Sequence, residues 1–123
     1  MAHSLFEILN LVEQEPSLHA KIQAHLRQLL NTRQGSLSHM PDYGLPDLLT
    51  VFQGLPGSIN RLLHVIAHTI GKYEPRFRTV RAELGTQQES ESVLHVVISG
   101  QIETGEPLVF DSYFMRGGDA KVL

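Results

Sequence analysis

The sequence predicts an α+β fold, in which N-terminal helices pack against a small C-terminal antiparallel β-sheet of about three strands. Up to about residue 73, apolar residues recur every three or four positions, the spacing of amphipathic helices. After Arg76 they alternate with polar residues, the spacing of half-buried strands, and short polar turns separate the alternating runs. We expect a single domain over residues 1–123, with a flexible tail from about residue 116, where Gly117 and Gly118 follow the last run.

Capping and helix-breaking residues mark the ends of the predicted helices. Ser4 suits the N-cap of the first helix, with Glu7 in position to close a capping box, and Pro16 interrupts the chain before the second. Pro46 suits the first turn of a short third helix, and Ser58 suits the N-cap of the last. The predicted helices cover residues 4–14, 17–31, 46–52 and 58–73.

Three alternating runs predict the strands. In the first run Val80, Ala82 and Leu84 share one face, as residues two apart do in a strand. Residues 85–92 are polar and rich in glutamate, which indicates a hairpin loop before the second run. The predicted strands cover residues 78–84, 93–102 and 107–114.

Composition and charge limit the possible functions. The chain has 123 residues, 41% of them hydrophobic, which is enough to bury a core. Its formal net charge is −3, and Lys and Arg are spread along it, so no basic patch indicates nucleic acid. Cysteine is absent, which excludes disulfides and cysteine-built metal sites and fits a reducing compartment. No apolar run approaches the roughly 18 residues of a membrane span, and no signal peptide is evident, so we expect a cytoplasmic protein without direct membrane insertion.

Patterns for metal binding and catalysis are weak, and we expect no cofactor, no metal and no enzymatic activity. His64 and His68 have the spacing of zinc ligands on a helix, but Val65 stands where the metalloprotease motif needs glutamate. Glu74 could pair with an aspartate as in a glycosidase, yet Arg76 beside it favours the ionised form over a general acid. No serine lies in a nucleophile-elbow sequence.

The most informative feature is Tyr73-Glu74-Pro75-Arg76, where the last helix must stop and the first strand must begin. Pro75 pushes Glu74 out of the α region and fixes its own φ. In an extended backbone Glu74 and Arg76 would project to the same side. Arg76 would then offer a planar fork to a partner's carboxylate while Glu74 accepts donors, which makes Glu74, Pro75 and Arg76 the predicted partner-binding residues. The alternative is a corner with a surface ion pair, which contributes about 0 to 1 kcal/mol.

Two further segments are rich in residues that form turns. Gly44 can adopt positive φ, and Gly35, Gly44, Pro41 and Pro46 shape the turns that return the chain onto its core. Arg33 and Asp42 could pair to hold the connection. We favour a structural role over direct partner contact for these turn residues, which are Asn31, Arg33, Gly35, Asp42, Tyr43, Gly44, Pro46 and Asp47.

Three segments occur in order along the chain: Leu29-Leu30-Asn31-Thr32-Arg33-Gln34-Gly35, Pro41-Asp42-Tyr43-Gly44-Leu45-Pro46-Asp47-Leu48 and Tyr73-Glu74-Pro75-Arg76. With the predicted helices and strands between them, they closely resemble the TssE-type baseplate subunit of bacterial type VI secretion systems. That family is similar to the baseplate wedge protein at which phage tail sheath assembly starts. The resemblance covers about residues 5–115. Gln34 departs from it, because the family usually has a second arginine there, and this weakens any contact assigned to that position.

The resemblance implies an assembly role. In this family the Glu-Pro-Arg motif docks onto a helical core bundle built by the other wedge subunits, and these contacts fall here on Glu74, Pro75 and Arg76. It also implies that an edge of the sheet accepts strands from the first contractile sheath subunits, at residues 78–84 or 107–114. The implied protein initiates sheath polymerisation in the bacterial cytoplasm, at the membrane-docked baseplate. The alternatives are a wedge protein of a phage-tail-like injection machine and a peptidoglycan hydrolase, since the family carries an old lysozyme-like label.

Overall fold

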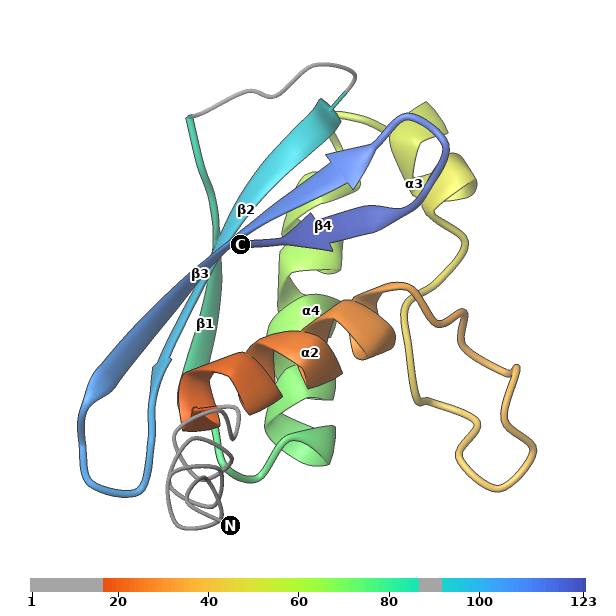
Figure 1. Ribbon diagram of the computed structural model, residues 1–123. Coiled ribbons are helices and arrows are strands. Elements are labelled where there is room, and N and C mark those ends of the chain that lie inside the picture. The colour runs from red at the N-terminus through yellow and green to blue at the C-terminus, as the bar shows by residue number, and fades with distance from the viewer. Residues whose placement is uncertain (1–16, 87–91) are drawn as a thin grey trace, which may run out of the picture.

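The computed structural model describes residues 17–86 and 92–123, and it has the predicted α+β architecture (Figure 1). The helix predicted at residues 4–14 lies outside the described residues. The elements follow in the order α2 (Leu18–Leu30), α3 (Leu48–Gln53), α4 (Ile59–Tyr73), β1 (Arg78–Leu84), β2 (Ser92–Gln101), β3 (Pro107–Met115) and β4 (Ala120–Val122).

The helices begin close to the predicted capping residues. The hydroxyl oxygen of Ser17 accepts a first-turn N–H of α2 at 3.1 Å. The carboxylate of Asp47 does the same for α3 at 3.2 Å, so this short helix begins one residue after Asp47. Ser58 stands at the start of α4, but its hydroxyl donates to the Val51 carbonyl at 2.6 Å. Ser58 therefore ties α4 to α3 instead of capping α4.

The sheet has four antiparallel strands in the order β1-β2-β3-β4, one more than predicted. The expected flexible tail from about residue 116 forms the fourth strand. Gly118, at φ 94°, lies in a tight turn after β3. Val122 is then 2% exposed, and Leu123 exchanges two backbone hydrogen bonds with Asp111, at 2.8 and 3.1 Å. A run of three residues is too short to show alternation in sequence, and pairing with β3 orders it.

One core lies between the helices and the sheet. Helices α2 and α4 lie against the same face of the sheet, and the segment between α2 and α3 extends to the side away from β1 (Figure 1). This arrangement follows from the two periods, because the helical stripes and the alternating strand residues turn toward one another. Among the described residues, the apolar residues with no exposed surface are Ile22, Leu26, Leu29, Ile66, Ile70, Val96, Ile98, Phe110 and Phe114.

Strand β1 enters the sheet through an irregular stretch. Its register with β2 shifts between Arg78 and Arg81, and Thr79 has a φ of 54°. Phe77, just before the strand, is 1% exposed. A Cβ on Gly100 of β2 would lie only 2.8 Å from the Phe77 ring, so glycine allows that ring to pack against the sheet. The chain is therefore anchored in the core immediately before β1.

Candidate functional site

The corner between α4 and β1 consists of a helix stop followed by a turn. The N–H of Glu74 donates to the Ile70 carbonyl at 2.8 Å, and Pro75 has no N–H with which to continue the helix. The N–H of Phe77 then donates to the Glu74 carbonyl at 3.1 Å. Because this turn folds the chain back, Glu74 and Arg76 do not point outward together as an extended segment would place them.

Glu74 turns its carboxylate into the protein, and its side chain is 1% exposed. Nε of Arg76 donates to Oε1 at 2.7 Å, and Nη2 donates to Oε2 at 2.8 Å. The backbone N–H of Arg76 adds a bond to Oε1 at 3.2 Å, and Nδ1 of His25 lies 2.7 Å from Oε2. The structure thus differs from the predicted display of Glu74 to a partner, since both carboxylate oxygens are already bonded inside the chain.

These hydrogen bonds keep the Glu74 carboxyl and the Arg76 guanidinium ionised. Burial raises the pKa of the Glu74 carboxyl, but the hydrogen bonds from Arg76 and His25 outweigh burial and leave that pKa below its ordinary value. The bond to Glu74 in turn raises the pKa of Arg76. A carboxyl group held ionised cannot donate a proton as a general acid, so the corner lacks the protonated group that a glycosidase needs.

Arg76 keeps part of its guanidinium available. Its side chain is 43% exposed, and Nη1 takes part in neither of the side-chain bonds to Glu74. Pro75 is exposed as well. The outward surface of the corner therefore consists of Pro75 and Arg76, with Glu74 beneath them as an internal support.

His25 is a member of this site that the sequence did not reveal. Its Nε2 lies 3.2 Å from the Tyr43 hydroxyl, while Nδ1 faces Glu74. Because an ionised carboxylate only accepts, Nδ1 carries the hydrogen in that bond. Burial, and then the charge of Glu74, raises the pKa of Tyr43. His25 and Glu74 are 49 residues apart, and no spacing pattern in the sequence connects them.

Asp42 ties the turn segment to α4. Nζ of Lys72 donates to one carboxylate oxygen at 2.5 Å, and the Tyr73 hydroxyl donates to the other. These bonds lower the pKa of Asp42 to about 2 and raise the pKa values of Lys72 and Tyr73. The predicted pair of Arg33 with Asp42 is therefore wrong. Arg33 instead lies 4.0 Å from Asp47, and since their side chains are 72% and 47% exposed, this pair contributes little to stability.

The turn segments are held side by side by their backbones. The N–H of Leu45 donates to the Thr32 carbonyl at 2.8 Å, and the N–H of Gln34 donates to the Leu45 carbonyl at 2.9 Å. Gly35 and Gly44 adopt φ values of +87° and +107°. At Gly44 a Cβ would lie 2.2 Å from the Thr32 carbonyl oxygen, so only glycine allows this approach.

Asn31 joins the end of α2 to β4. Its Nδ2 donates to the carbonyls of Ala120 and Arg27, at 3.0 and 2.8 Å, and its Oδ1 accepts the N–H of Ala120 at 2.9 Å. Nε2 of Gln23 donates to the Val122 carbonyl at 2.9 Å. The side-chain amides of Gln23, in α2, and of Asn31, which follows α2, therefore occupy the outer edge of β4, where another strand would otherwise pair.

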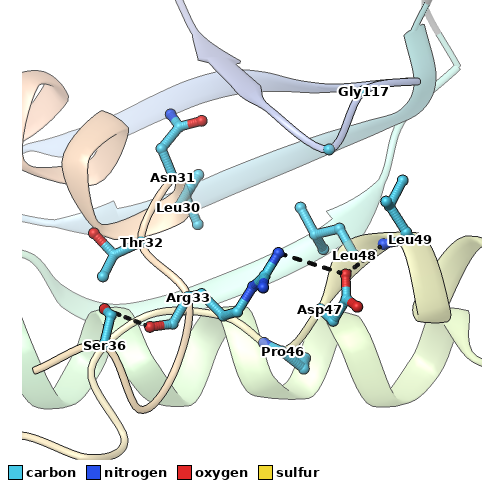
Figure 2. A pocket seen from close by; sticks show the side chains of 11 residues that line it. Leu30, Asn31, Thr32, Arg33, Ser36, Pro46, Asp47, Leu48, Leu49 and Gly117 are labelled. Carbon is cyan, nitrogen blue, oxygen red and sulfur yellow. Dashed lines mark hydrogen bonds and ion pairs between the residues drawn. The ribbon is translucent and has the colours of Figure 1, made fainter.

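A cleft of about 390 Å³ opens beside the turn segments. In Figure 2, Arg33 and Asp47 face one another within it, and Gly117 of the β3–β4 turn lies across from them. Its other polar side chains are Asn31, Thr32 and Ser36. This lining contains no histidine and no buried carboxylate, so it does not offer an acid–base pair.

The described part of the chain has neither a cluster of metal ligands nor a membrane-spanning helix. Within residues 17–86 and 92–123, no three His, Asp or Glu side chains lie close enough together to hold a metal ion. His64 and His68 stack on each other, with ring centroids 6.2 Å apart. None of the helices among these residues is long and apolar enough to cross a membrane.

Comparisons with known proteins place this fold in a family. Residues 16–106 match the family model described as baseplate wedge protein gp25. A solved chain of the baseplate complex from the type VI secretion system is 30% identical, with a TM-score of 0.60, over 76% of this chain and 90% of that one. A crystal structure from Geobacter sulfurreducens, provisionally described as a tail lysozyme, is 18% identical with a TM-score of 0.56, over 82% and 93% of the two chains. At that identity the likeness shows the fold alone. No curated protein sequence matches the chain closely enough to count as a relative.

Proposed function

Because the chain belongs to the baseplate wedge protein gp25 family, we propose that it is a structural subunit of a type VI secretion baseplate wedge and docks there through Pro75 and Arg76. The observation that carries the docking surface is the corner itself. Arg76 is half-exposed and charged, and a buried carboxylate holds it from beneath. The proposed partner is the helical core bundle of the other wedge subunits. The wedge would stand in the bacterial cytoplasm, at the membrane-docked baseplate.

The role of Glu74 in this proposal is to position Arg76. Two parallel hydrogen bonds fix the plane of the guanidinium, and the Nη1 group is left to donate to a carboxylate of the bundle. Pro75 adds a rigid apolar contact next to that group. A lysine in place of Arg76 would keep the charge and could still pair with Glu74, but it would lose the planar fork.

Substitution of Arg76 by lysine tests this docking surface without leaving Glu74 unpaired. We expect Arg76→Lys to weaken co-purification with the core wedge subunits about tenfold or more while far-UV circular dichroism stays unchanged. Arg116→Lys, an exposed change of the same kind in the β3–β4 turn, is the matched control. Equal recovery of the core subunits by wild type and Arg76→Lys would contradict the proposal.

The sheath contact is proposed at the outer edge of β1. Of the candidate edge at residues 107–114, only the part from Asp111 onward lies between β2 and β4, and the outer edge of β4 is occupied by the amides of Asn31 and Gln23. Residues 107–110 pair with no described strand on the side away from β2, so β1 offers the longer open edge. The N–H of Gly85 donates to β2, so alternation directs the backbone groups of Ala82 and Leu84 away from the sheet. An extended sheath segment could pair with these groups by strand addition and so start the polymer.

A proline at this edge tests the sheath contact. Ala82→Pro removes an outward N–H and leaves the pairing of β1 with β2 intact, because proline is tolerated on an edge strand. We expect the variant to enter the wedge normally but to fail in starting sheath tubes, as seen by electron microscopy of the reconstituted system. If Ala82→Pro initiates sheath normally, β1 is not the edge that accepts the sheath strand.

A second candidate function is a wedge subunit in a phage-tail-like injection machine. The family model describes baseplate wedge proteins in general, and the same contacts would serve in either machine. Gene neighbourhood separates the two candidates. If the gene for this protein lies beside genes for phage tail proteins and not beside secretion genes, the second candidate is correct. Peptidoglycan hydrolysis has no support from the ionised corner, and turnover of purified cell wall that disappears in Glu74→Gln would reinstate it.

A further inference from the structure

The solvent face of α4 carries a stripe of basic and histidine side chains. Arg61, His64, His68 and Lys72 are all exposed, and their spacing of three to four residues places them on one side of the helix. The opposite side of α4 is buried in the core. The helix Ile59–Tyr73 contains no Asp or Glu, so nothing on α4 itself neutralises the stripe. We name Arg61, His64, His68 and Lys72 the α4 stripe.

Two hollows lie between the α4 stripe and the turn segments. One has a volume of about 390 Å³ and the other about 200 Å³. Both are lined by Gln34 and Val65, so they lie next to each other, and we call the two hollows together the groove. Val51, Leu62 and Val65 give the groove apolar walls, and Arg61, His64 and His68 border it. The groove thus combines apolar surface with a rim of one arginine and two histidines on the α4 side, and Asp42 and Asp47 line its other side.

The acidic residues on the opposite side of the groove are already engaged within the chain. Asp42 is bonded to Lys72 and Tyr73, and Asp47 caps α3 and faces Arg33. Arg61 makes no ion pair or hydrogen bond with another side chain among residues 17–86 and 92–123. Arg61 therefore presents a positive charge that this part of the chain does not neutralise, beside two imidazole rings whose N–H groups can donate hydrogen bonds.

From this combination we infer that the groove binds an acidic amphipathic helix of another baseplate subunit. This inference rests on the proposed function and adds a second contact surface to it. The α4 helix has 15 residues and so spans about 22 Å, which a partner helix of four turns would match. Such a helix places carboxylates every three or four residues, opposite the α4 stripe, and apolar side chains between them, in the hollows. A nucleic acid would meet the charge but would leave the apolar walls uncovered.

The groove and the docking corner are linked through Asp42. Asp42 lines the smaller hollow and is bonded to Lys72 and Tyr73, and Glu74, Pro75 and Arg76 follow these two residues in the chain. A helix lying in the groove would therefore reach a surface next to Arg76. The two surfaces can still be separated by mutation, because Arg61 and His68 make no contact with the Glu74–Arg76 pair.

Charge reversal tests the inference on the assembled wedge. We expect the double variant Arg61→Glu/His68→Glu to reduce co-purification with the core wedge subunits at least tenfold, and the loss to be largest at low salt. Lys21→Glu reverses an exposed charge on α2 and is the control, with wild-type recovery expected. If the double variant recovers the core subunits at the wild-type level, the inference is overturned. If in that experiment Arg76→Lys still loses recovery, the proposed function stands without the second contact surface.

Cross-linking identifies what occupies the groove. The chain has no cysteine, so His68→Cys provides a single site for a photoreactive label, and Glu106→Cys in the β2–β3 turn provides the control. In the reconstituted wedge we expect the label at residue 68 to attach to an acid-rich helical segment of another subunit. Attachment to nucleic acid, to an extended segment, or equally from residue 106 overturns the inference. A wild-type protein that does not co-purify at all would overturn the proposed function as well.

Discussion

Replacement of Glu74 by alanine should destabilise the isolated protein, because this carboxylate supports the whole corner. Removal of one member of a buried ion pair costs about 3 to 5 kcal/mol when its partner stays buried. Here the partners can recover water, since the side chains of Arg76 and His25 are 43% and 24% exposed. We therefore expect the free energy of unfolding to fall by about 2 to 3 kcal/mol.

Urea unfolding followed by far-UV circular dichroism measures this difference, and an unchanged slope confirms that the same surface is exposed on unfolding. Glu83→Ala is the control, because Glu83 is an exposed acid on β1 and its loss should change the free energy by less than about 0.5 kcal/mol. If Glu74→Ala is also within about 0.5 kcal/mol of wild type, the corner does not depend on the buried carboxylate, and the role of Glu74 in positioning Arg76 fails.

Three further predictions concern acid, the turn glycines and the β4 edge. Folding lowers the pKa of Glu74, so its contribution to the free energy of unfolding is complete above the ordinary pKa of 4.5 and is lost as pH falls through the pKa of the folded state. For the same reason, the contribution of Asp42 is lost between pH 3.8 and about pH 2. Acid titration of unfolding should show this fall, and Glu74→Gln should flatten its upper part. Gly44→Ala should destabilise the protein by clearly more than about 1 kcal/mol, because the new Cβ meets the Thr32 carbonyl. Gly35→Ala has open space around the new Cβ and should cost about 1 kcal/mol. Equal shifts of the melting temperature in the two variants would contradict this difference. Asn31→Ala should cost about 1 to 2 kcal/mol and speed amide hydrogen exchange at Ala120, and unchanged exchange there would show that the amide does not protect the β4 edge.

Local patterns in the sequence predicted most of the fold. The second predicted helix, 17–31, is observed as Leu18–Leu30, and the strand predicted at 93–102 is observed as Ser92–Gln101. These elements have long periodic stripes and clear caps or turns, so short-range physics fixes them. The strand Ala120–Val122 was missed because its order comes from pairing with β3 and from the amides of α2, neither of which is a local signal.

The geometry of the candidate site was predicted only in part, because tertiary contacts determine the rest of it. The sequence identified the corner and its two opposite charges, but it placed Glu74 on the surface. The direction of Glu74 is set by His25, from a different helix, and by the turn that brings Arg76 back over the carboxylate. In the same way, Asp42 pairs with Lys72 and Tyr73 of α4 because the turn segment folds against that helix.

The hydrogen bonds that Arg76 donates to Glu74 lower the entropy that a partner must remove when it binds Arg76. A free arginine side chain has about 2 kcal/mol of rotamer entropy, which it loses when it is immobilised. In this protein folding itself already restricts the Arg76 side chain, through two hydrogen bonds to a buried carboxylate. A partner that contacts Arg76 therefore meets a preorganised group and spends little of its binding free energy on ordering it.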